Sequence, residues 1–335
     1  MTGSVRTSLV LRSRPSGAPG PANFAAVEEP MPTPAPGEVL TRTLFLSIDP
    51  YMRGRLSDRA SYAAPVQLGE VMTGESVGEV VASTVPGLAP GDVVVGSRGW
   101  QTHSVTPAKA LVKLDRHGPP LSTYLGVLGM PGTTAYSGMK DIGQVKRGET
   151  VVVSAASGPV GSVAGQLAKR AGARVVGIAG GPEKCLWVQE TLGFDDCIDH
   201  RTMDVAAALR IACPRGVDVY FENVGGVVQQ AAFALLNPFA RVIMCGMVAE
   251  YNDARPAPGP NLMFVVRNRV RIEGLIVSDK PERFAEWRAL AAPWVADGSL
   301  RYRETVVDGL ENAPDALAMV LSGGNFGKML VRVAG

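Results

Sequence analysis

Residues that bind metal ions are scarce in this sequence. Cysteine is absent from the first 184 residues, and no two cysteines form a Cys-x-x-Cys pair. A zinc site needs several Cys or His ligands that converge on one point. We therefore expect no metal, and we expect the cysteines to be reduced thiols. The cysteines and histidines are Cys185, Cys197, Cys213, Cys245, His103, His117 and His200.

Long apolar runs and an excess of charge are also missing. No run of about 18 apolar residues occurs, the length that suggests a transmembrane helix. Residues 1–14 mix Ser, Thr and Arg and lack the apolar centre of a signal peptide. The formal net charge is +2, and no basic run occurs. The sequence therefore predicts a cytoplasmic protein with no membrane segment and no nucleic-acid partner.

Apolar residues, by contrast, are plentiful. They make up 46% of the 335 residues, and charged residues make up 19%, which suits one large or two ordinary domains. Up to residue 125, short runs between Gly/Pro turns predict a β-rich, barrel-like domain. The expected strands are 7–12, 38–46, 71–81 and 93–95, with a loop over 47–55.

From about residue 121, strand-like and helix-like segments alternate. This alternation predicts an α/β protein with a parallel, doubly wound sheet. The expected strands are 150–154, 174–179, 196–198, 217–221, 240–245 and 270–277, and a last strand covers 329–333. The expected helices are 160–171, 182–192, 203–213, 226–236, 281–297 and 312–322.

The segment 149–169 is the centre of this second half. The β-branched run 151–153 is typical of a buried strand, and apolar residues at helical spacing begin at residue 160. A turn of small residues lies between them, in the order of a dinucleotide-binding site. Its glycine frame, Ala156-x-Gly158-x-x-Gly161, lacks the first glycine. The backbone N–H groups at the helix start would face the phosphates. The expected cofactor-binding residues here are Ala156, Ser157, Gly158, Pro159, Val160 and Gly161.

The end of the next strand indicates which nucleotide binds. A fold that prefers NAD usually has Asp or Glu there, on the ribose 2′-hydroxyl. Strand 174–179 instead ends in Gly180-Gly181-Pro182, and Lys184 follows soon after. The missing carboxylate and the nearby cation favour a 2′-phosphate, so NADP(H) is the expected cofactor, with Gly180 and Lys184 in contact. The alternative is that Lys184 is a solvated charge at a helix start.

Further motifs resemble those of a known family. The motifs are Leu46-Ser47-Ile48-Asp49-Pro50-Tyr51-Met52-Arg53-Gly54-Arg55, Gly129-Met130-Pro131-Gly132-Thr133-Thr134-Ala135-Tyr136, Phe221-Glu222-Asn223-Val224-Gly225-Gly226 and Gly324-Asn325-Phe326-Gly327-Lys328. In their order, over nearly the whole chain, they are similar to the zinc-independent branch of the medium-chain dehydrogenase/reductases that contains leukotriene B4 12-hydroxydehydrogenase, prostaglandin reductase and curcumin reductase.

The resemblance implies the domain organisation and the absence of zinc. A GroES-like β-rich catalytic domain would cover 1–125 and 301–335, and a Rossmann NADP-binding domain would cover 126–300. Zinc-dependent members of the superfamily carry a Gly-His-Glu-x-x-Gly motif. The similar segment 73–78 has Gly74 in place of the histidine, although Glu75 is present.

The resemblance also implies a reaction. The C=C bond of α,β-unsaturated aldehydes and ketones would receive a hydride from NADPH at the β-carbon and a proton at the α-carbon. Charge would develop on an enolate oxygen, which hydrogen bonds can stabilise. Tyr251, just after the strand that ends near Gly246, and Tyr51 are the expected catalytic residues. Alternatively, both are packing aromatics with a satisfied hydroxyl.

Further cofactor contacts follow from the same resemblance. Lys184 matches the lysine that binds the 2′-phosphate, and His200 stands where eukaryotic members have a tyrosine. Because an imidazole has a pKa of about 6.5, the affinity for NADPH is expected to depend on pH. Met130 and Thr134 would line the nicotinamide side, and Asn223 and Asn325 would hydrogen-bond the nicotinamide half, although Asn223 suits a strand-end turn equally well. The remaining expected cofactor-binding residues are Cys245, Gly246 and Tyr251.

Several alternatives stay open at this stage. Arg53 and Arg55 either steer an anion or are solvated. The activity is that of an enone reductase, of a zinc-free quinone reductase, or of an NADPH-binding sensor without turnover. The strand 270–277 would extend the sheet across a two-fold axis, which predicts a homodimer. Pro256, Pro258 and Pro260 indicate a stiffened loop over the cleft.

Overall fold

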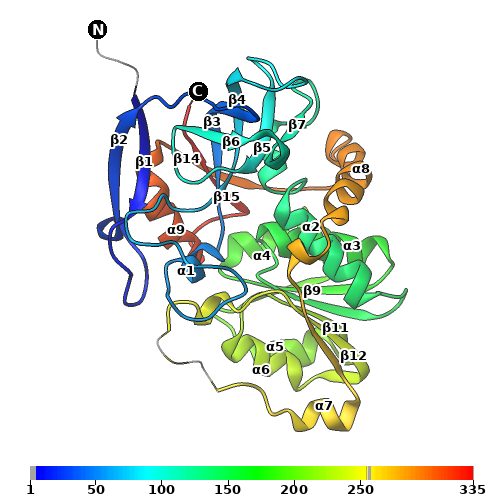
Figure 1. The fold of residues 1–335 in the computed structure, drawn as a ribbon. Helices are drawn as coiled ribbons and strands as arrows, with labels where there is room; N and C mark the ends of the chain where they lie inside the picture. Colours follow the sequence, from blue (N-terminus) through cyan, green and yellow to red (C-terminus); the bar gives the residue numbers. More distant parts are fainter. Residues whose placement is uncertain (1–4, 254, 256–257, 335) are drawn as a thin grey trace. The chain divides into compact units, whose positions relative to one another are not determined.

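The computed structural model of the chain describes residues 5–253, 255 and 258–334. The chain divides into two compact units, each of which is described by itself (Figure 1). Unit 1 contains the residues up to Leu125 and those from Glu304 onward, and unit 2 contains Gly126–Arg303. Among the described residues, no helix has both the length and the apolar character needed to cross a bilayer. Pro256, one of the three expected loop prolines, lies outside the described residues.

Unit 1 is built mainly from antiparallel strands. A seven-stranded sheet runs in the order β14, β15, β3, β4, β5 and β7, with β6 paired to β3, and β1 pairs with β2 in a separate sheet. The last strand of the chain, β15, lies antiparallel to β3, with Met329 opposite Ile48. The strands are β1 (Val5–Leu11), β2 (Phe24–Pro30), β3 (Glu38–Ile48), β4 (Glu75–Ser83), β5 (Val93–Ser97), β6 (His103–Pro107), β7 (Val112–Leu114), β14 (Glu304–Asp308) and β15 (Lys328–Arg332), and the helices are α1 (Met52–Arg55) and α9 (Ala313–Leu321).

The sequence patterns located part of this sheet. The expected strand 71–81 begins only at Glu75, and the expected loop over 47–55 contains the end of β3 and the single helical turn α1. The strands β2, β6, β7 and β14 were not predicted. β6, β7 and β14 have no more than five residues each, and β2 carries two glutamates and a terminal proline, residues that are depleted in strands.

Unit 2 contains a six-stranded parallel sheet in the order β10, β9, β8, β11, β12 and β13. This is the strand order of a dinucleotide-binding fold. Successive strands are added on one side of β8 up to β10 and on its other side from β11 onward, so the order switches between β8 and β11. The predicted doubly wound parallel sheet is therefore confirmed. The strands are β8 (Thr150–Ser154), β9 (Arg174–Ala179), β10 (Asp196–Asp199), β11 (Val217–Glu222), β12 (Leu236–Met244) and β13 (Arg271–Gly274).

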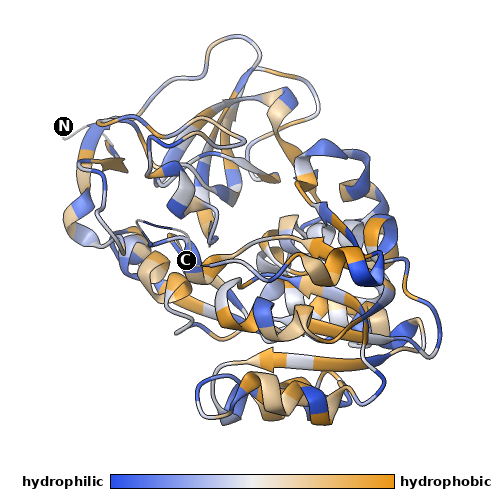
Figure 2. Cartoon of the chain, turned by 90° about the horizontal axis from the view of Figure 1, so that it is seen from below, coloured by the Kyte–Doolittle hydropathy of each residue, from blue (hydrophilic) through white to orange (hydrophobic). Residues whose placement is uncertain are grey.

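Helices cover both faces of this sheet. Figure 1 shows α2 and α3 on one face and α5 and α6 on the other. Every residue of β8 is buried, and the strands of the sheet are coloured mostly as hydrophobic in Figure 2. The helices of unit 2 are α2 (Met130–Ser137), α3 (Pro159–Arg170), α4 (Pro182–Glu190), α5 (Val205–Ala212), α6 (Gly226–Phe233), α7 (Met263–Asn268) and α8 (Glu282–Ala296).

Unit 2 differs from the sequence prediction at β13, at α2 and at α7, a helix that the sequence did not predict. The expected apolar strand 270–277 is only the four-residue β13, all four residues of which are exposed, and a 3-10 turn follows at Val277–Asp279. Helix α2, which continues into a π-helix at Gly138–Gly143, was not predicted. Its sequence contains Pro131, Gly132 and two threonines, which are weak helix formers. A Cβ on Gly132 would lie 1.9 Å from Val127 O, so packing requires this glycine.

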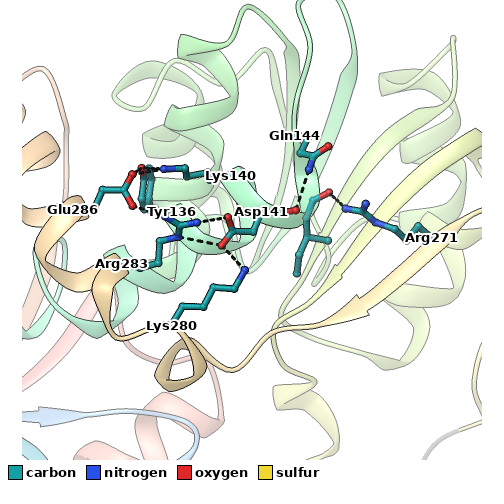
Figure 3. Close-up of polar contacts among 9 residues, drawn as sticks. Tyr136, Lys140, Asp141, Gln144, Arg271, Lys280, Arg283 and Glu286 are labelled. Carbon is teal, nitrogen blue, oxygen red and sulfur yellow. Dashed lines mark hydrogen bonds and ion pairs between the residues drawn. The ribbon is translucent and has the colours of Figure 1, made fainter.

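A network of charged side chains joins this helical segment to α8 (Figure 3). Arg283 Nη2 donates to Asp141 Oδ1 at 2.7 Å, and Tyr136 Oη donates to Glu286 Oε1 at 2.7 Å. Lys140 Nζ also pairs with Glu286. The network fixes α8 beside α2 through several ion pairs rather than through a single exposed pair.

Candidate functional site

The glycine turn after β8 has the geometry of an anion-binding helix start. Ala155 adopts a positive φ of 49°, and Ala156 N–H donates to Ile178 O at 3.0 Å. Gly158 is the N-cap of α3, where no side chain caps the helix and no acidic residue lies in the first turn. A Cβ on Gly161 would lie 2.4 Å from Ala155 O, so only glycine fits there. The N-terminal N–H groups of α3 are thus left without side-chain acceptors and favour a bound anion.

A buried network ties β8 to β11 at the point where the strand order reverses. Ser154 Oγ donates to Glu222 Oε1 at 3.0 Å and accepts from Asn223 N–H at 2.8 Å. The Asn223 side-chain amide donates to Ser154 O at 2.8 Å. Burial raises the pKa of the Glu222 carboxyl, and N–H donors at Val224 and Gly225 oppose that shift. Asn223 is therefore held at the carboxyl end of the sheet, where ligands bind in such folds.

The end of β12 belongs to the same edge of the sheet. The N–H groups of Cys245 and Gly246 donate to Glu222 O at 3.0 and 3.1 Å. Burial raises the pKa of the Cys245 thiol to about 12, so it is protonated at neutral pH. Tyr251 follows a 3-10 turn at Val248–Glu250 and is half-buried. The structure thus brings the turn 156–161, Asn223, Cys245, Gly246 and Tyr251 to the carboxyl ends of neighbouring strands.

A second group of residues lies at the ends of β9 and β10. Asp199 is 7% exposed and accepts from Gly181 N–H at 2.8 Å and from Arg201 N–H at 3.0 Å. Its carboxylate therefore points at the backbone and not at a ligand. A Cβ on Gly180 would lie 2.8 Å from His200 Nε2 and 3.0 Å from Arg201 Nε. These two side chains close over the Gly180–Gly181 turn.

Three basic side chains, Lys184, His200 and Arg201, follow the ends of β9 and β10, and we call them the cationic cradle. Burial, and then the charge of Arg201, lower the pKa of Lys184. The same two causes, in the same order, lower the pKa of His200. The cradle therefore combines a lysine, an arginine and an imidazole of lowered pKa, a set of hydrogen-bond donors that suits a phosphate.

Met130 and Thr134 are placed one helical turn apart on α2. Thr134 Oγ donates to Met130 O at 2.8 Å, and Thr134 is 6% exposed. Helix α2 packs against α3, the helix that follows the glycine turn. Both residues thus belong to unit 2, the unit that also contains the glycine turn after β8.

Tyr51 and Asn325 belong to unit 1. Burial raises the pKa of the Tyr51 phenol, and Asp49 and Glu75 raise it further. The Asn325 side-chain amide donates to Gly327 O at 2.7 Å. Both residues lie beside the ends of paired strands, β3 and β15.

Arg53 and Arg55 are not solvated, because each is only 8% exposed. Arg53 Nε donates to Gly17 O at 3.1 Å, and Arg55 Nη1 donates to Ala63 O at 2.9 Å. The Arg55 guanidinium also lies over the rings of Tyr51 and Tyr62, 5.6 and 4.6 Å from their centres. Both arginines therefore hold the loop segments around α1.

Gly74, which stands where zinc-dependent members have a histidine, is tightly packed and leaves no room for a side chain. A Cβ on Gly74 would lie 2.9 Å from Leu46 Cδ1 and 3.0 Å from Trp100 Cδ1. Within residues 5–253, 255 and 258–334, no group of three or more His, Cys, Asp or Glu side chains is arranged to hold a metal ion.

Sequence reasoning missed four residues of these groups, Ser154, Asp199, Arg201 and Glu222. Arg201 had the clearest signal, since it directly follows His200 at a strand end. Asp199 and Glu222 had a weaker one, an acid at the last position of a strand. Their roles depend on side-chain direction, which strand periodicity alone does not give.

Known proteins are similar to this chain in sequence and in fold. A family model for the N-terminal domain of oxidoreductases matches residues 7–114, and one for zinc-binding dehydrogenases matches residues 159–297. The NADPH-dependent curcumin reductase of Escherichia coli (strain K12) is 50% identical over 332 residues, which are 97% of this chain and 96% of that protein. Prostaglandin reductase 1 of Rattus norvegicus is 40% identical over 96% of this chain and 97% of its own.

A solved structure of a similar protein has the same fold as this chain. The crystal structure of CurA from Vibrio vulnificus in complex with NADPH has a TM-score of 0.94 and 46% identity, and it covers 98% of this chain and 99% of its own. The resemblance drawn from the motifs is confirmed. The chain belongs to the medium-chain dehydrogenase/reductase family, in the branch that contains the curcumin and prostaglandin reductases.

Proposed function

We propose that this protein reduces the C=C bond of α,β-unsaturated aldehydes and ketones with NADPH, without a metal. Hydride goes to the β-carbon and a proton to the α-carbon. The single observation that carries the proposal is the cationic cradle beside an uncapped glycine turn, on a chain whose relatives include a curcumin reductase and a 2-alkenal reductase. A 2-alkenal reductase of Nicotiana tabacum, 40% identical over 89% of this chain, is among them.

The relatives also bear on the cofactor and the enzyme class. The predictions of NADP(H) and of an NADP-dependent oxidoreductase are confirmed by relatives that are named for NADPH-dependent reduction and by the NADPH complex of CurA. The residues of this chain fit that cofactor. The turn 156–161 receives the pyrophosphate, and the cationic cradle receives the 2′-phosphate.

Bound NADPH supplies the hydride, and the chain supplies position and hydrogen bonds. Asn223, which the Ser154–Glu222 network holds, orients the nicotinamide half together with Met130, Thr134 and Asn325. Tyr251 donates a hydrogen bond to the enolate oxygen, where negative charge develops. Tyr51 is a second donor, and its raised pKa makes it a hydrogen-bond donor rather than a source of protons. The proton at the α-carbon then comes from solvent.

A panel of acceptors separates this proposal from its alternatives. NADPH oxidation is followed by absorbance with a trans-2-alkenone, its saturated ketone and a quinone, with NADH as the control. Turnover of the alkenone alone, with NADPH well ahead of NADH, supports the proposal. Turnover of the quinone alone supports a quinone reductase. Tight NADPH binding with no acceptor in the panel supports a sensor.

We also propose that the protein is a cytoplasmic homodimer in which β13 pairs with its copy. One side of β13 pairs with β12, and its residues are exposed, which leaves an edge for a further strand. The four cysteines are free thiols, as expected of a protein kept in reducing surroundings. Light scattering tests the dimer. A monomer mass for the parent protein, or a dimer mass for an Ile272→Pro variant, contradicts pairing through β13.

A further inference from the structure

The side chain of Lys328 is a buried cation whose hydrogen bonds are complete. Lys328 is 2% exposed, and its ammonium donates to Ile48 O at 2.6 Å and to Met329 O at 2.8 Å. Its third partner is Asp49 Oδ1 at 3.2 Å. Asp49 is 3% exposed, and Ser47 Oγ donates to its other oxygen. A lysine ammonium has three donors, and all three are used here.

This pair joins two motifs from opposite ends of the chain. Lys328 begins β15, and Asp49 directly follows β3, to which β15 is paired. Asp49 is also the first residue of the turn that presents Tyr51, because Met52 N–H donates to Asp49 O at 3.1 Å. The ammonium thus holds the start of that turn through a main-chain carbonyl and a carboxylate.

Asp49 acts electrostatically on both of its neighbours. Burial lowers the pKa of Lys328, and Asp49 is the largest of the influences that raise it, ahead of Glu75 and Glu304. Burial raises the pKa of Tyr51, and Asp49 is the next largest cause. The anion beside the phenol is therefore the one that Lys328 neutralises.

We propose that Lys328 is a positioning residue, which acts through Asp49 to fix the place and the electrostatic surroundings of the Tyr51 phenol. If Lys328 is replaced by an apolar residue, the Asp49 carboxylate is buried without its cation, a costly state that moves the turn. The effect on turnover rests on the proposed function, whereas the effect on Tyr51 itself does not.

A spectroscopic experiment tests the position of Tyr51 without turnover. The protein is labelled with 3-fluorotyrosine, and the resonance of Tyr51 is assigned with a Tyr51→Phe variant. In Lys328→Met and in Asp49→Asn, this resonance is expected to shift or broaden, while that of Tyr220 in unit 2 stays in place. Lys113→Met is the matched control, since Lys113 pairs with Asp92 on the surface of the same unit.

Either of two outcomes of the spectroscopic experiment contradicts the proposal. The proposal is overturned if the Tyr51 resonance keeps its parent position in every variant that folds, or if Tyr220 moves as much as Tyr51. Asp49→Asn keeps the shape of the side chain, so it carries the test if Lys328→Met does not fold.

Turnover of an alkenone provides a second arm. Lys328→Met is expected to lower kcat about tenfold, as expected when a hydrogen-bond donor to the developing charge is misplaced. In a Tyr51→Phe background the same substitution is expected to change kcat less than about threefold, because the group it positions is gone. An equal loss in both backgrounds indicates a merely structural role. If the parent reduces no enone, the proposed function fails and the spectroscopic arm still decides this inference.

Discussion

The phenol oxygen of Tyr251 lies 2.9 Å from the point that a Cβ atom on Gly246 would occupy. The backbone of Gly246 is fixed, because its N–H donates to Glu222 O at 3.1 Å. The ring of Tyr251 is therefore the part that yields when a side chain is introduced at this position.

Replacement of Gly246 by alanine tests the role of Tyr251. Gly246 has no positive φ, so alanine causes no backbone strain, and its methyl group displaces the phenol. We expect kcat for an alkenone to fall about tenfold, a modest part of the loss seen when a donor to an oxyanion is removed. Steady-state kinetics with varied alkenone measures the change.

A matched glycine provides the control for this substitution. No atom lies within 4 Å of a Cβ on Gly274, which also belongs to unit 2. Gly274→Ala is expected to retain the parent kcat. An equal kcat for Gly246→Ala and the parent would show that Tyr251 takes no part in the reaction.

The cationic cradle sets the preference for NADPH over NADH. Arg201→Gln removes a charge that we expect to bind the 2′-phosphate, a loss of about 1.5 kcal/mol, or about tenfold. The KM for NADPH is therefore expected to rise about tenfold and that for NADH to stay constant. A parallel rise for both nucleotides would instead indicate a damaged fold of the turn.

The fold was easier to predict from the sequence than the cradle. The strand 174–179 and its glycine end follow from local pattern, since β-branched runs and glycines act on their own backbone. The role of Arg201 depends on β10 lying beside β9, which brings it over Gly180 from 21 residues away. The pair of Asp49 and Lys328 is more distant still, and only the register of β3 against β15 brings it together. The expected strand 270–277 was predicted too long, because an apolar run at a sheet edge does not reveal where the pairing with the next strand stops.

The titration of His200 gives a prediction of definite sign. Burial and the charge of Arg201 lower its pKa, so His200 in the cofactor-free protein is expected to titrate below about 6.5. Arg201→Gln removes a neighbouring cation, makes protonation easier and raises that pKa. NMR titration of the imidazole C–H resonances, assigned with His200→Gln, measures both values. A pKa above 6.5 for His200 in the parent protein would contradict the account that burial and the charge of Arg201 act on this imidazole.

The network around α8 predicts a loss of stability in acid. Hydrogen bonds from Lys140, Tyr136 and Arg283 lower the pKa of Glu286 to about 2. A carboxylate with a depressed folded-state pKa stabilises the protein fully above about pH 4.5, and this stabilisation is lost as pH falls towards about 2. Glu286→Gln is therefore expected to lower Tm by about 2 °C at pH 7 and by less at pH 3.

The exposed Glu282 on the same helix provides the comparison. Glu282→Gln is expected to leave Tm unchanged at both pH values, as measured by circular dichroism. A difference between Glu286→Gln and the parent that is as large at pH 3 as at pH 7 would show that Glu286 acts by packing and not by charge.

The destination of the hydride tests the central claim most directly. An alkenone is reduced in ordinary water with NADPH that carries deuterium at C4, each of the two stereoisomers being used in turn, and the product is examined by NMR. With one isomer, deuterium is expected at the β-carbon of the saturated ketone, and the hydrogen at the α-carbon is expected to come from water. Deuterium at the carbonyl carbon of an allylic alcohol would contradict C=C reduction by this protein.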